Sequence, residues 1–231
     1  MAISLLAKEL DALRKFSTPA ICSAIDTFNV RPRNEGFMTS EIRCLLPDLG
    51  VMVGYAATAR IMADEPAVEG HQVSRLDWWD YLQEIPKPRV VVFHDLDRVV
   101  TGAYWGEQTT NIHKALGCVG VITDGGVRDL EETRALGFHA FAAHVLVSHA
   151  YVHLVDFGVP VRVGGLTVNP GDLLHGDRHG VTSVPASIAA EVASAATRAA
   201  RQDRQIIELC QYPDFTLEAL KERWKKIRGI Y

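Results

Sequence analysis

Apolar residues recur at helical spacing at both ends of the chain. Four leucines within residues 3–16 lie near one face of a helix, and Pro19 suits the first turn of a second helix. Pro185 and Pro213 mark where helices begin and end near the carboxyl terminus. These patterns predict helices over residues 3–16, 19–28, 186–211 and 217–227.

In the centre of the chain, short and almost continuous apolar runs alternate with helical segments. Such runs are typical of strands buried on both faces of a parallel sheet. The triplet Asp124, Gly125 and Gly126 predicts a turn directly after one run. The alternation favours α/β layering with right-handed crossovers. The predicted strands cover residues 51–62, 90–93, 118–123 and 138–143, and the predicted helices cover 69–83, 106–116 and 129–136.

The pattern changes after residue 158, where tight turns separate short strands. Asn169-Pro170-Gly171 has proline and glycine where a type II turn favours them. The strands, expected over residues 159–163, 166–168, 172–174 and 180–184, predict an antiparallel meander beside the α/β part. We expect one α/β domain over residues 1–231, with a core at about 18–190, a helical start over 1–17 and closing helices over 186–231.

Composition narrows the class of protein. With 231 residues, 48% of them hydrophobic, the chain can build a full core. A net charge of -4 argues against a nucleic-acid binder, and the basic run at 221–228 is typical of a solvated helix face. No apolar run approaches the about 18 residues that span a bilayer. Four cysteines without a CxxC pair or a preceding secretory signal favour reduced thiols in a cytoplasmic protein, with Cys118 buried.

The densest candidate chemistry lies in two motifs, Trp-Gly-Glu-Gln-Thr-Thr-Asn at 105–111 and Gly-Val-Ile-Thr-Asp-Gly-Gly-Val-Arg-Asp at 120–129. If a helix begins at Gly106, the backbone N–H groups of Glu107, Gln108 and Thr109 have no partner within that helix. Such a helix start attracts carboxylates and phosphates. Ligands in open α/β sheets gather at the carboxyl ends of strands, where the second motif also falls. The two motifs therefore predict an anion-binding site.

Arg128 and Asp129 add charge to this predicted site. Arginine suits a carboxylate that it can hold by two parallel hydrogen bonds, and aspartate suits a hard cation such as Mg²⁺. Glu107 could hold a water of that cation. Together these groups would neutralise an α-oxo acid and stabilise an enolate. The alternative is a structural surface pair at a helix start, in which Asp129 only caps the helix.

Histidines form two weaker constellations. His144, His149 and His153 lack the glutamate of an HExxH motif, so they are more typical of core or interface histidines than of a zinc site. His175, Asp177 and His179 alternate, would share one strand face, and could line a cleft, although a catalytic role is the lesser expectation.

The sequence lacks several motifs of common enzyme classes. The chain has no Walker A loop, no GxGxxG and no GxSxG, so nucleotide hydrolysis, dinucleotide binding and serine hydrolysis have no support. Asp124 could face the site, but an aspartate that forms a turn before two glycines is the favoured interpretation. Asp26 could contribute to the site of a neighbouring subunit.

The segment WGEQTTNIHKALGCVGVITDGGVRDLEETRALGFHAFA resembles the signature region of the regulator of ribonuclease activity A family, and VNPGDLLHGDRHGVTSVP resembles that family's closing strands. The similarity covers roughly residues 18–190 and is tightest from 105 to 185. The family includes class II 4-hydroxy-4-methyl-2-oxoglutarate aldolases and many proteins mislabelled as demethylmenaquinone methyltransferases. This chain lacks the glycine-rich cofactor loop that a methyltransferase needs.

The resemblance implies a swivelling β/β/α domain, like the phosphohistidine domain, assembled as a trimer or hexamer with active sites between subunits. By resemblance, Asp129 ligates Mg²⁺ or Mn²⁺, and Arg128 binds the carboxylate and oxo groups of a pyruvyl unit. Gln108 and Thr109, which follow Gly106, match positions whose backbone amides hold the carboxylate. Glu107 matches an acid that orients a metal-bound water.

The implied activity is aldol cleavage of 4-hydroxy-4-methyl-2-oxoglutarate or a related 4-hydroxy-2-oxo acid to pyruvate, in which a water of lowered pKa takes the proton of the C4 hydroxyl. The same enolate chemistry permits decarboxylation of oxaloacetate. Two rivals stay open: a lyase for sugar-derived oxo acids, and a non-catalytic regulator that binds an RNA-degrading enzyme. Asp129 favours an enzyme, because a pure regulator need not keep the metal-ligating acid.

The chain also departs from its relatives. Residues 108–113 are more polar than the small and aliphatic residues usual there, which affects the expected substrate. Residues 63–87, with Trp78 and Trp79, are unlike the usual relatives. The family expects one more acid from the neighbouring subunit's C-terminal region, for which Glu191 and Glu208 are both candidates.

Overall fold

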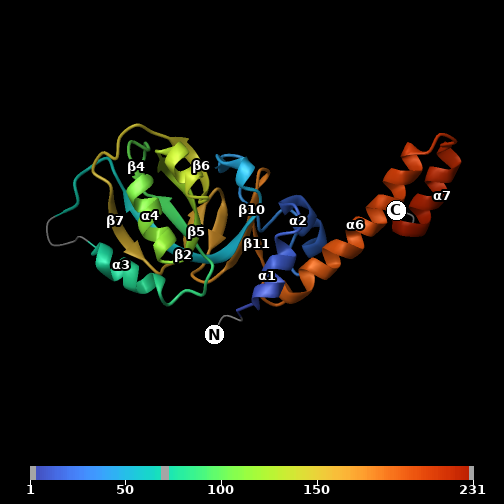
Figure 1. The fold of residues 1–231 in the computed structure, drawn as a ribbon, viewed down its shortest axis with the longest axis horizontal. Helices are drawn as coiled ribbons and strands as arrows, with labels where there is room; N and C mark the ends of the chain where they lie inside the picture. The colour runs from blue at the N-terminus through green and yellow to red at the C-terminus, as the bar shows by residue number, and fades with distance from the viewer. Residues whose placement is uncertain (1–3, 69–72, 229–231) are drawn as a thin grey trace.

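The computed structural model describes residues 4–68 and 73–228 and centres on one mixed sheet (Figure 1). Four neighbouring strands run parallel in the order β6-β5-β3-β2, and β4 pairs in parallel with β5. The parallel strands are β2 (Met52–Met62), β3 (Arg89–Asp95), β4 (Ala103–Trp105), β5 (Cys118–Val127) and β6 (His139–Val145). The predicted parallel centre is confirmed, whereas β4 had no clear signal in the sequence.

Antiparallel strands complete the sheet on both sides. β1 pairs with β6, β7 and β10 each pair with β2, and β11 pairs with β10. A separate hairpin is formed by β8 and β9. These strands are β1 (Arg43–Cys44), β7 (His153–Phe157), β8 (Val161–Val163), β9 (Leu166–Val168), β10 (Leu173–Asp177) and β11 (Gly180–Val184).

The predicted meander over residues 159–184 is therefore only partly correct. The hairpin of β8 and β9 does pack beside the sheet, but β10 and β11 are part of the sheet itself. Leu173 lies opposite Tyr55 and His175 lies opposite Val53 in the antiparallel ladder between β10 and β2. The apolar pattern of a short strand does not reveal which distant strand it pairs with, so the error arises from a non-local choice.

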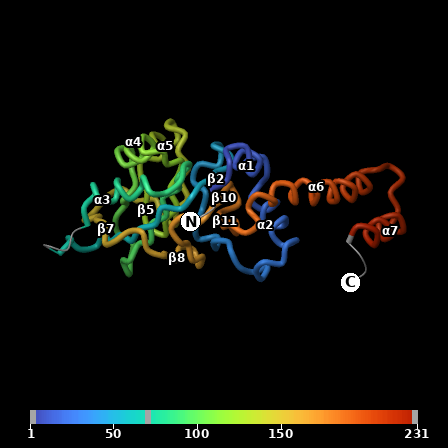
Figure 2. Tube along the Cα trace, turned by 90° about the horizontal axis from the view of Figure 1, so that it is seen from below, coloured from blue at the N-terminus to red at the C-terminus, as the bar shows by residue number. Residues whose placement is uncertain are grey.

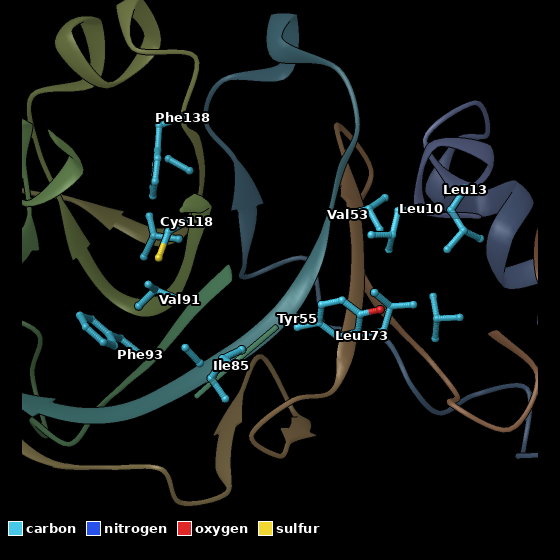
Figure 3. Close-up of a cluster of buried hydrophobic side chains, with 14 of the residues drawn as sticks. Leu10, Leu13, Val53, Tyr55, Ile85, Val91, Phe93, Cys118, Phe138 and Leu173 are labelled. Carbon is cyan, nitrogen blue, oxygen red and sulfur yellow. The ribbon is translucent and has the colours of Figure 1, made fainter. Parts of the chain in front are cut away.

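Two hydrophobic clusters cover opposite faces of the sheet, because successive side chains of a strand point to opposite faces. Val91 and Phe93 belong to the cluster beneath the helices, whereas Val90 and Val92 belong to the cluster beneath β8 and β9. Figure 3 shows part of the first cluster, in which Leu10 and Leu13 lie near Val53 and Leu173. The alternation explains why these strands read as continuous apolar runs.

The helices of the structure are mostly those predicted. Ser17 caps α2 by accepting a hydrogen bond from the N–H of Ala20 (3.4 Å). The helices are α1 (Ala7–Leu13), α2 (Thr18–Asp26), α3 (Arg75–Leu82), α4 (Glu107–Ala115), α5 (Leu130–Ala135), α6 (Ala189–Gln211) and α7 (Leu217–Arg228), with a short 3-10 turn at Pro47–Leu49. The helix predicted over 69–83 is shorter, and its predicted start at 69–72 lies outside the described residues.

The turn predicted at Asp124-Gly125-Gly126 is wrong, since β5 continues to Val127. The glycines serve close approach instead of a turn. A Cβ at Gly125 would lie 2.6 Å from Asp95 Oδ2, and one at Gly126 would lie 2.5 Å from Leu146 Cδ1. Asp124 is held across the sheet by the backbone N–H of Asp95, which donates to Asp124 Oδ1 (2.8 Å). The longer β5 carries the chain directly to Arg128.

The carboxyl-terminal helices form an arm that projects from the sheet (Figures 1 and 2). The first part of α6 packs on α1 and α2 through Ala189, Val192, Ala195 and Ala196, all of which are buried. The rest of α6 leaves the core, and α7 folds back beside it (Figure 2). The arm and the end of the sheet with α3 and β7 therefore lie at opposite ends of the molecule.

Candidate functional site

The candidate site lies where β4 and β5 end beside each other. β4 leads into Gly106 and α4, and β5 leads into Arg128 and Asp129. The backbone N–H of Arg128 donates to the carbonyl oxygen of Trp105 (2.8 Å), so the two connections are joined immediately before their polar residues. The structure thus brings together the two motifs in which the sequence placed the chemistry.

Asp129 adopts a left-handed backbone conformation (φ 56°, ψ 50°) that non-glycine residues rarely occupy. It stands at the start of α5, but its side chain makes no capping hydrogen bond there. Instead, Asp129 Oδ2 accepts a hydrogen bond from the backbone N–H of Glu107 (2.9 Å). The alternative in which Asp129 only caps its own helix is therefore wrong: its carboxylate is turned toward the start of α4.

Arg128 completes a small charged group at this place. Its Nε lies 3.6 Å from Asp129 Oδ2, and both side chains remain about one-third exposed. Such an exposed pair contributes little to stability. Both groups thus remain accessible to a ligand.

Gly106 makes this close arrangement possible. The predicted helix start at this position is confirmed, and Gly106 itself precedes α4 in an extended conformation. A Cβ at this position would lie 2.5 Å from Asp129 Oδ2 and 3.2 Å from Arg128 Nε. Any larger residue would push the carboxylate and the guanidinium away from the helix start, so glycine is required by space and not by an unusual φ.

The first turn of α4 is held from behind by buried hydrogen bonds. Trp105 Nε1 donates to Thr110 Oγ1 (2.9 Å), and Thr110 Oγ1 donates to the carbonyl oxygen of Gly106 (2.9 Å). His113 Nε2 accepts from Trp78 Nε1 (2.9 Å), which leaves Nδ1–H to donate to the carbonyl oxygen of Thr109 (2.8 Å). Burial lowers the pKa of His113 to about 4, so this histidine stays neutral and acts as a structural link.

A cleft of about 840 Å³ opens in front of these groups. All six positions suggested by the sequence line it: Gly106, Glu107, Gln108, Thr109, Arg128 and Asp129. Two further lining residues, His149 and His153, belong to the weaker histidine constellation of the sequence analysis. The remaining lining residues had no role suggested by the sequence: Pro66, Ala67, Val73, Ser74, Arg75, Ala103, Tyr104, Ala150, Tyr151, Val152 and Leu154.

The two cleft histidines are not core residues. His149 is exposed and His153 is half-buried, and each ring Nδ1 lies near a backbone carbonyl oxygen, that of Ala150 (2.7 Å) and that of Tyr151 (2.9 Å). His144 is exposed and does not line the cleft. Within residues 4–68 and 73–228, no three histidine, cysteine, aspartate or glutamate side chains come together in a way that could hold a metal ion. This result disfavours the zinc alternative.

His175 and Asp177 lie away from the cleft and hold α2 on the sheet. Thr18 Oγ1 lies 2.9 Å from His175 Nδ1, and the backbone N–H of Thr18 donates to Asp177 Oδ2 (3.0 Å). Burial lowers the pKa of His175. For Asp177, burial acts to raise the pKa, but the hydrogen bonds that its carboxylate accepts from His179 and Thr18 outweigh burial, so the pKa of Asp177 is lowered. His179 follows the strand and does not extend its face. The possible catalytic role of these residues finds no support.

A second acidic group lies where the carboxyl end of β3 adjoins β5. Asp124 Oδ2 lies 2.6 Å from His94 Nδ1, and the N–H of Asp97 donates to Asp95 Oδ1 (3.0 Å). Asp95 is 6% exposed, and within the described residues its Oδ2 has no hydrogen-bond partner. Burial raises the pKa of Asp95 to about 6. None of these side chains lines the cleft.

Comparison with known proteins assigns the family. Residues 18–183 match the family model described as "RraA-like: Aldolase/RraA". The chain is 32% identical over 99 residues to a Halalkalibacterium halodurans protein named "Putative 4-hydroxy-4-methyl-2-oxoglutarate aldolase"; that match covers 42% of this chain and 47%, about half, of the relative.

Solved structures agree on the fold. An uncharacterised protein from Pseudomonas syringae pv. tomato superposes with a TM-score of 0.75 at 24% identity, covering 96% of each chain. Streptomyces coelicolor RraAS2, described as an unusual member of the RNase ES inhibitor RraA family, superposes with a TM-score of 0.67 at 24% identity, covering 87% of this chain and 97% of the other.

The chain therefore belongs to the Aldolase/RraA family and has its swivelling β/β/α fold. Across the described residues, none of the helices has both the length and the apolar character needed to cross a bilayer.

Proposed function

We propose that this chain is a metal-dependent lyase that cleaves a 4-hydroxy-2-oxo acid, such as 4-hydroxy-4-methyl-2-oxoglutarate, to pyruvate. The observation that carries the proposal is the joint placement of Arg128 and Asp129 against the start of α4, in one cleft. A cation, an anion and free helix N–H groups within one site match the needs of an oxo acid that becomes an enolate. The name of the H. halodurans relative points the same way.

The role of each residue follows from its position. The N–H groups at the start of α4 that the helix leaves without partners, at Gln108 and Thr109, would bind the carboxylate of the pyruvyl unit. Arg128 would hold the same unit through its carboxylate and 2-oxo oxygens. As the C4 oxygen loses its proton and becomes the carbonyl of the second product, the C3–C4 bond would break and its electron pair would move into the pyruvate enolate, whose negative oxygen Arg128 would stabilise. A proton from water would then add to C3 of the enolate and give pyruvate. Glu107, exposed beside them, would orient the water that accepts the proton of the C4 hydroxyl.

Asp129 would hold the Mg²⁺ or Mn²⁺ ion that the family implies. Asp129 and Glu107 are the two carboxylate residues among those that line the cleft, and no group of three possible ligands occurs in the described residues. This donor set fits a cation that keeps most of its waters and does not fit a closed site of several protein ligands. The bound ion would supply Lewis-acid polarisation of the 2-oxo group.

We also propose that the complete site lies between subunits of a trimer or hexamer. Glu191 and Glu208 lie on α6, and Asp26 ends α2. The projecting end of α6, which carries Glu208, lies at the opposite end of the molecule from α3 and β7, which line the cleft (Figures 1 and 2). An acid on that end of the arm could reach only the cleft of another copy.

The test is pyruvate release from 4-hydroxy-4-methyl-2-oxoglutarate and from oxaloacetate, with Mg²⁺, with Mn²⁺ and with EDTA. We expect release that needs the metal and that Asp129→Asn abolishes, since asparagine keeps an acceptor for the N–H of Glu107 but removes the charge. Glu132→Gln is the matched control, because Glu132 is an exposed acid of α5 outside the cleft.

Three results would contradict the proposal. Equal release in EDTA would exclude a metal requirement, and full activity of Asp129→Asn would exclude a metal held by Asp129. No release from either compound by the folded, metal-supplied protein would turn attention to sugar-derived oxo acids. If these too were inert, a non-catalytic regulator of an RNA-degrading enzyme would be the better account.

A further inference from the structure

Arg75 places a second cation in the same cleft, and no role has yet been assigned to it. It comes from α3 and is one of the residues that line the cleft. In the described part of the chain, no carboxylate forms an ion pair with it. Arg128, by contrast, already has Asp129 beside it. Among the described residues, the cleft thus contains one guanidinium with a carboxylate partner and one without.

The position of Arg75 is set by an anchored helix. Ser74 caps α3 by accepting hydrogen bonds from the N–H groups of Leu76 (3.1 Å) and Asp77 (3.4 Å). One turn later, Trp78 is fully buried and bonded to His113 of α4. Arg75 is therefore carried by a helix that is tied to the same helix whose first turn forms the proposed carboxylate site.

The guanidinium itself is held over an aromatic ring. Arg75 Cζ lies 5.6 Å from the ring centroid of Tyr104, and Tyr104 is 8% exposed. A ring face steadies a cation without neutralising its charge. Tyr104 belongs to β4, two residues before Gly106, so Arg75 is held near the proposed carboxylate site but comes from a different element than Arg128 does.

We propose that Arg75 determines specificity by binding a second carboxylate, at the end of the substrate remote from the 2-oxo acid group. The substrate would then be a dianionic 4-hydroxy-2-oxo acid, and not a sugar-derived acid with a neutral polyol end. The physical reason is that an exposed arginine with no acidic partner among the described residues suits a bidentate carboxylate. This inference rests on the proposed function for the orientation of the substrate.

The experiment compares two substrates that differ only in the charge of the remote end: a 4-hydroxy-2-oxo acid with a carboxylate on C4, and one with a methyl group on C4. The variants are Arg75→Gln and Arg75→Lys. We expect Arg75→Gln to lower the ratio of the two kcat/KM values by about 10- to 100-fold, mainly through KM of the dianion. Lysine should restore part of the ratio, because it keeps the charge but not the planar fork. Arg201→Gln, an exposed arginine on the arm, is the control.

Binding of unreactive probes separates this inference from the proposed function. Calorimetry would measure 2-oxoglutarate, a dianion, against 2-oxobutanoate, a monoanion, for each variant in the presence of Mg²⁺. A wild-type preference for the dianion that Arg75→Gln removes would support the inference even if no lyase activity were found. An unchanged ratio in Arg75→Gln, in turnover or in binding, would overturn it while leaving the lyase proposal intact.

Discussion

Two groups of acids lie at the carboxyl ends of parallel strands, and they differ in nearly every physical respect. At the end of β5, Asp129 is about one-third exposed, lies beside Arg128 and opens onto a cleft. At the end of β3, Asp95 is buried, and its pKa is raised by burial. The same edge of one sheet thus contains an accessible charged site and a closed acidic cluster.

The difference shows that strand ends alone do not define a functional site. Both groups include glycines that allow close approach, Gly106 in the first and Gly125 in the second. Only the first combines an accessible cation with the free N–H groups of a helix start, which together suit an anion. The following changes test this comparison, from the largest expected effect to the smallest.

Replacing Arg128 with lysine should have the largest effect on the open site. Lysine keeps the charge but loses the planar fork that holds a carboxylate and an enolate oxygen, so we expect kcat/KM for pyruvate release to fall by about 100- to 1,000-fold. Steady-state kinetics would measure this fall, with thermal unfolding as a check on the fold. A loss smaller than about tenfold would mean that Arg128 does not bind the reacting group.

Gly106→Ala tests the close approach directly. The added Cβ would lie 2.5 Å from Asp129 Oδ2, so the carboxylate must move. We expect about a 100-fold loss of kcat/KM, as a misplacement of about 1 Å produces, with only a small change in melting temperature because the backbone conformation is an ordinary one. A crystal structure of the variant with an undisturbed Asp129, or unchanged kinetics, would show that this spacing is not critical.

Trp78→Phe tests the buried link between α3 and α4. The substitution removes the indole N–H that His113 Nε2 accepts and leaves a small cavity. We expect a loss of about 3 kcal/mol in the free energy of unfolding, measured by denaturant titration. Trp79→Phe, a half-buried neighbour in the same helix, is the control and should cost clearly less. Equal losses would contradict a specific role for the bond.

Asp95→Asn tests the closed cluster through the pH dependence of stability. The folded protein holds the Asp95 proton up to about pH 6, above the ordinary value of 3.8, so it binds more protons than the unfolded chain between these values. Stability is therefore lost as pH rises through this window. Asparagine cannot ionise, so the variant should gain about 3 kcal/mol relative to wild type above pH 6 and nothing below pH 4.

Unfolding curves at several pH values would measure this gain. A difference that does not change with pH would show that Asp95 is not the group responsible. The variant should leave pyruvate release unchanged, since Asp95 does not line the cleft.

Much of the fold and of the site was visible in the sequence because local patterns carry it. Continuous apolar runs predicted β2, β3, β5 and β6, since strands covered on both faces need apolar residues at every position. A helix start at Gly106 and the pair at Arg128 and Asp129 were equally visible. Motif order and spacing were sufficient to indicate the family, which the match over residues 18–183 confirms.

Tertiary structure alone decided the features that depend on distant partners. The glycines after Asp124 resemble a turn locally, yet the strand continues because Asp95 and Leu146 approach them from elsewhere in the fold. The left-handed conformation of Asp129 becomes understandable only with the N–H of Glu107 in place. Arg75 has no local signal at all, since its place in the cleft depends on the packing of Trp78. Sequence patterns report what a segment prefers by itself, whereas close approach and pairing are set by residues far away in the chain.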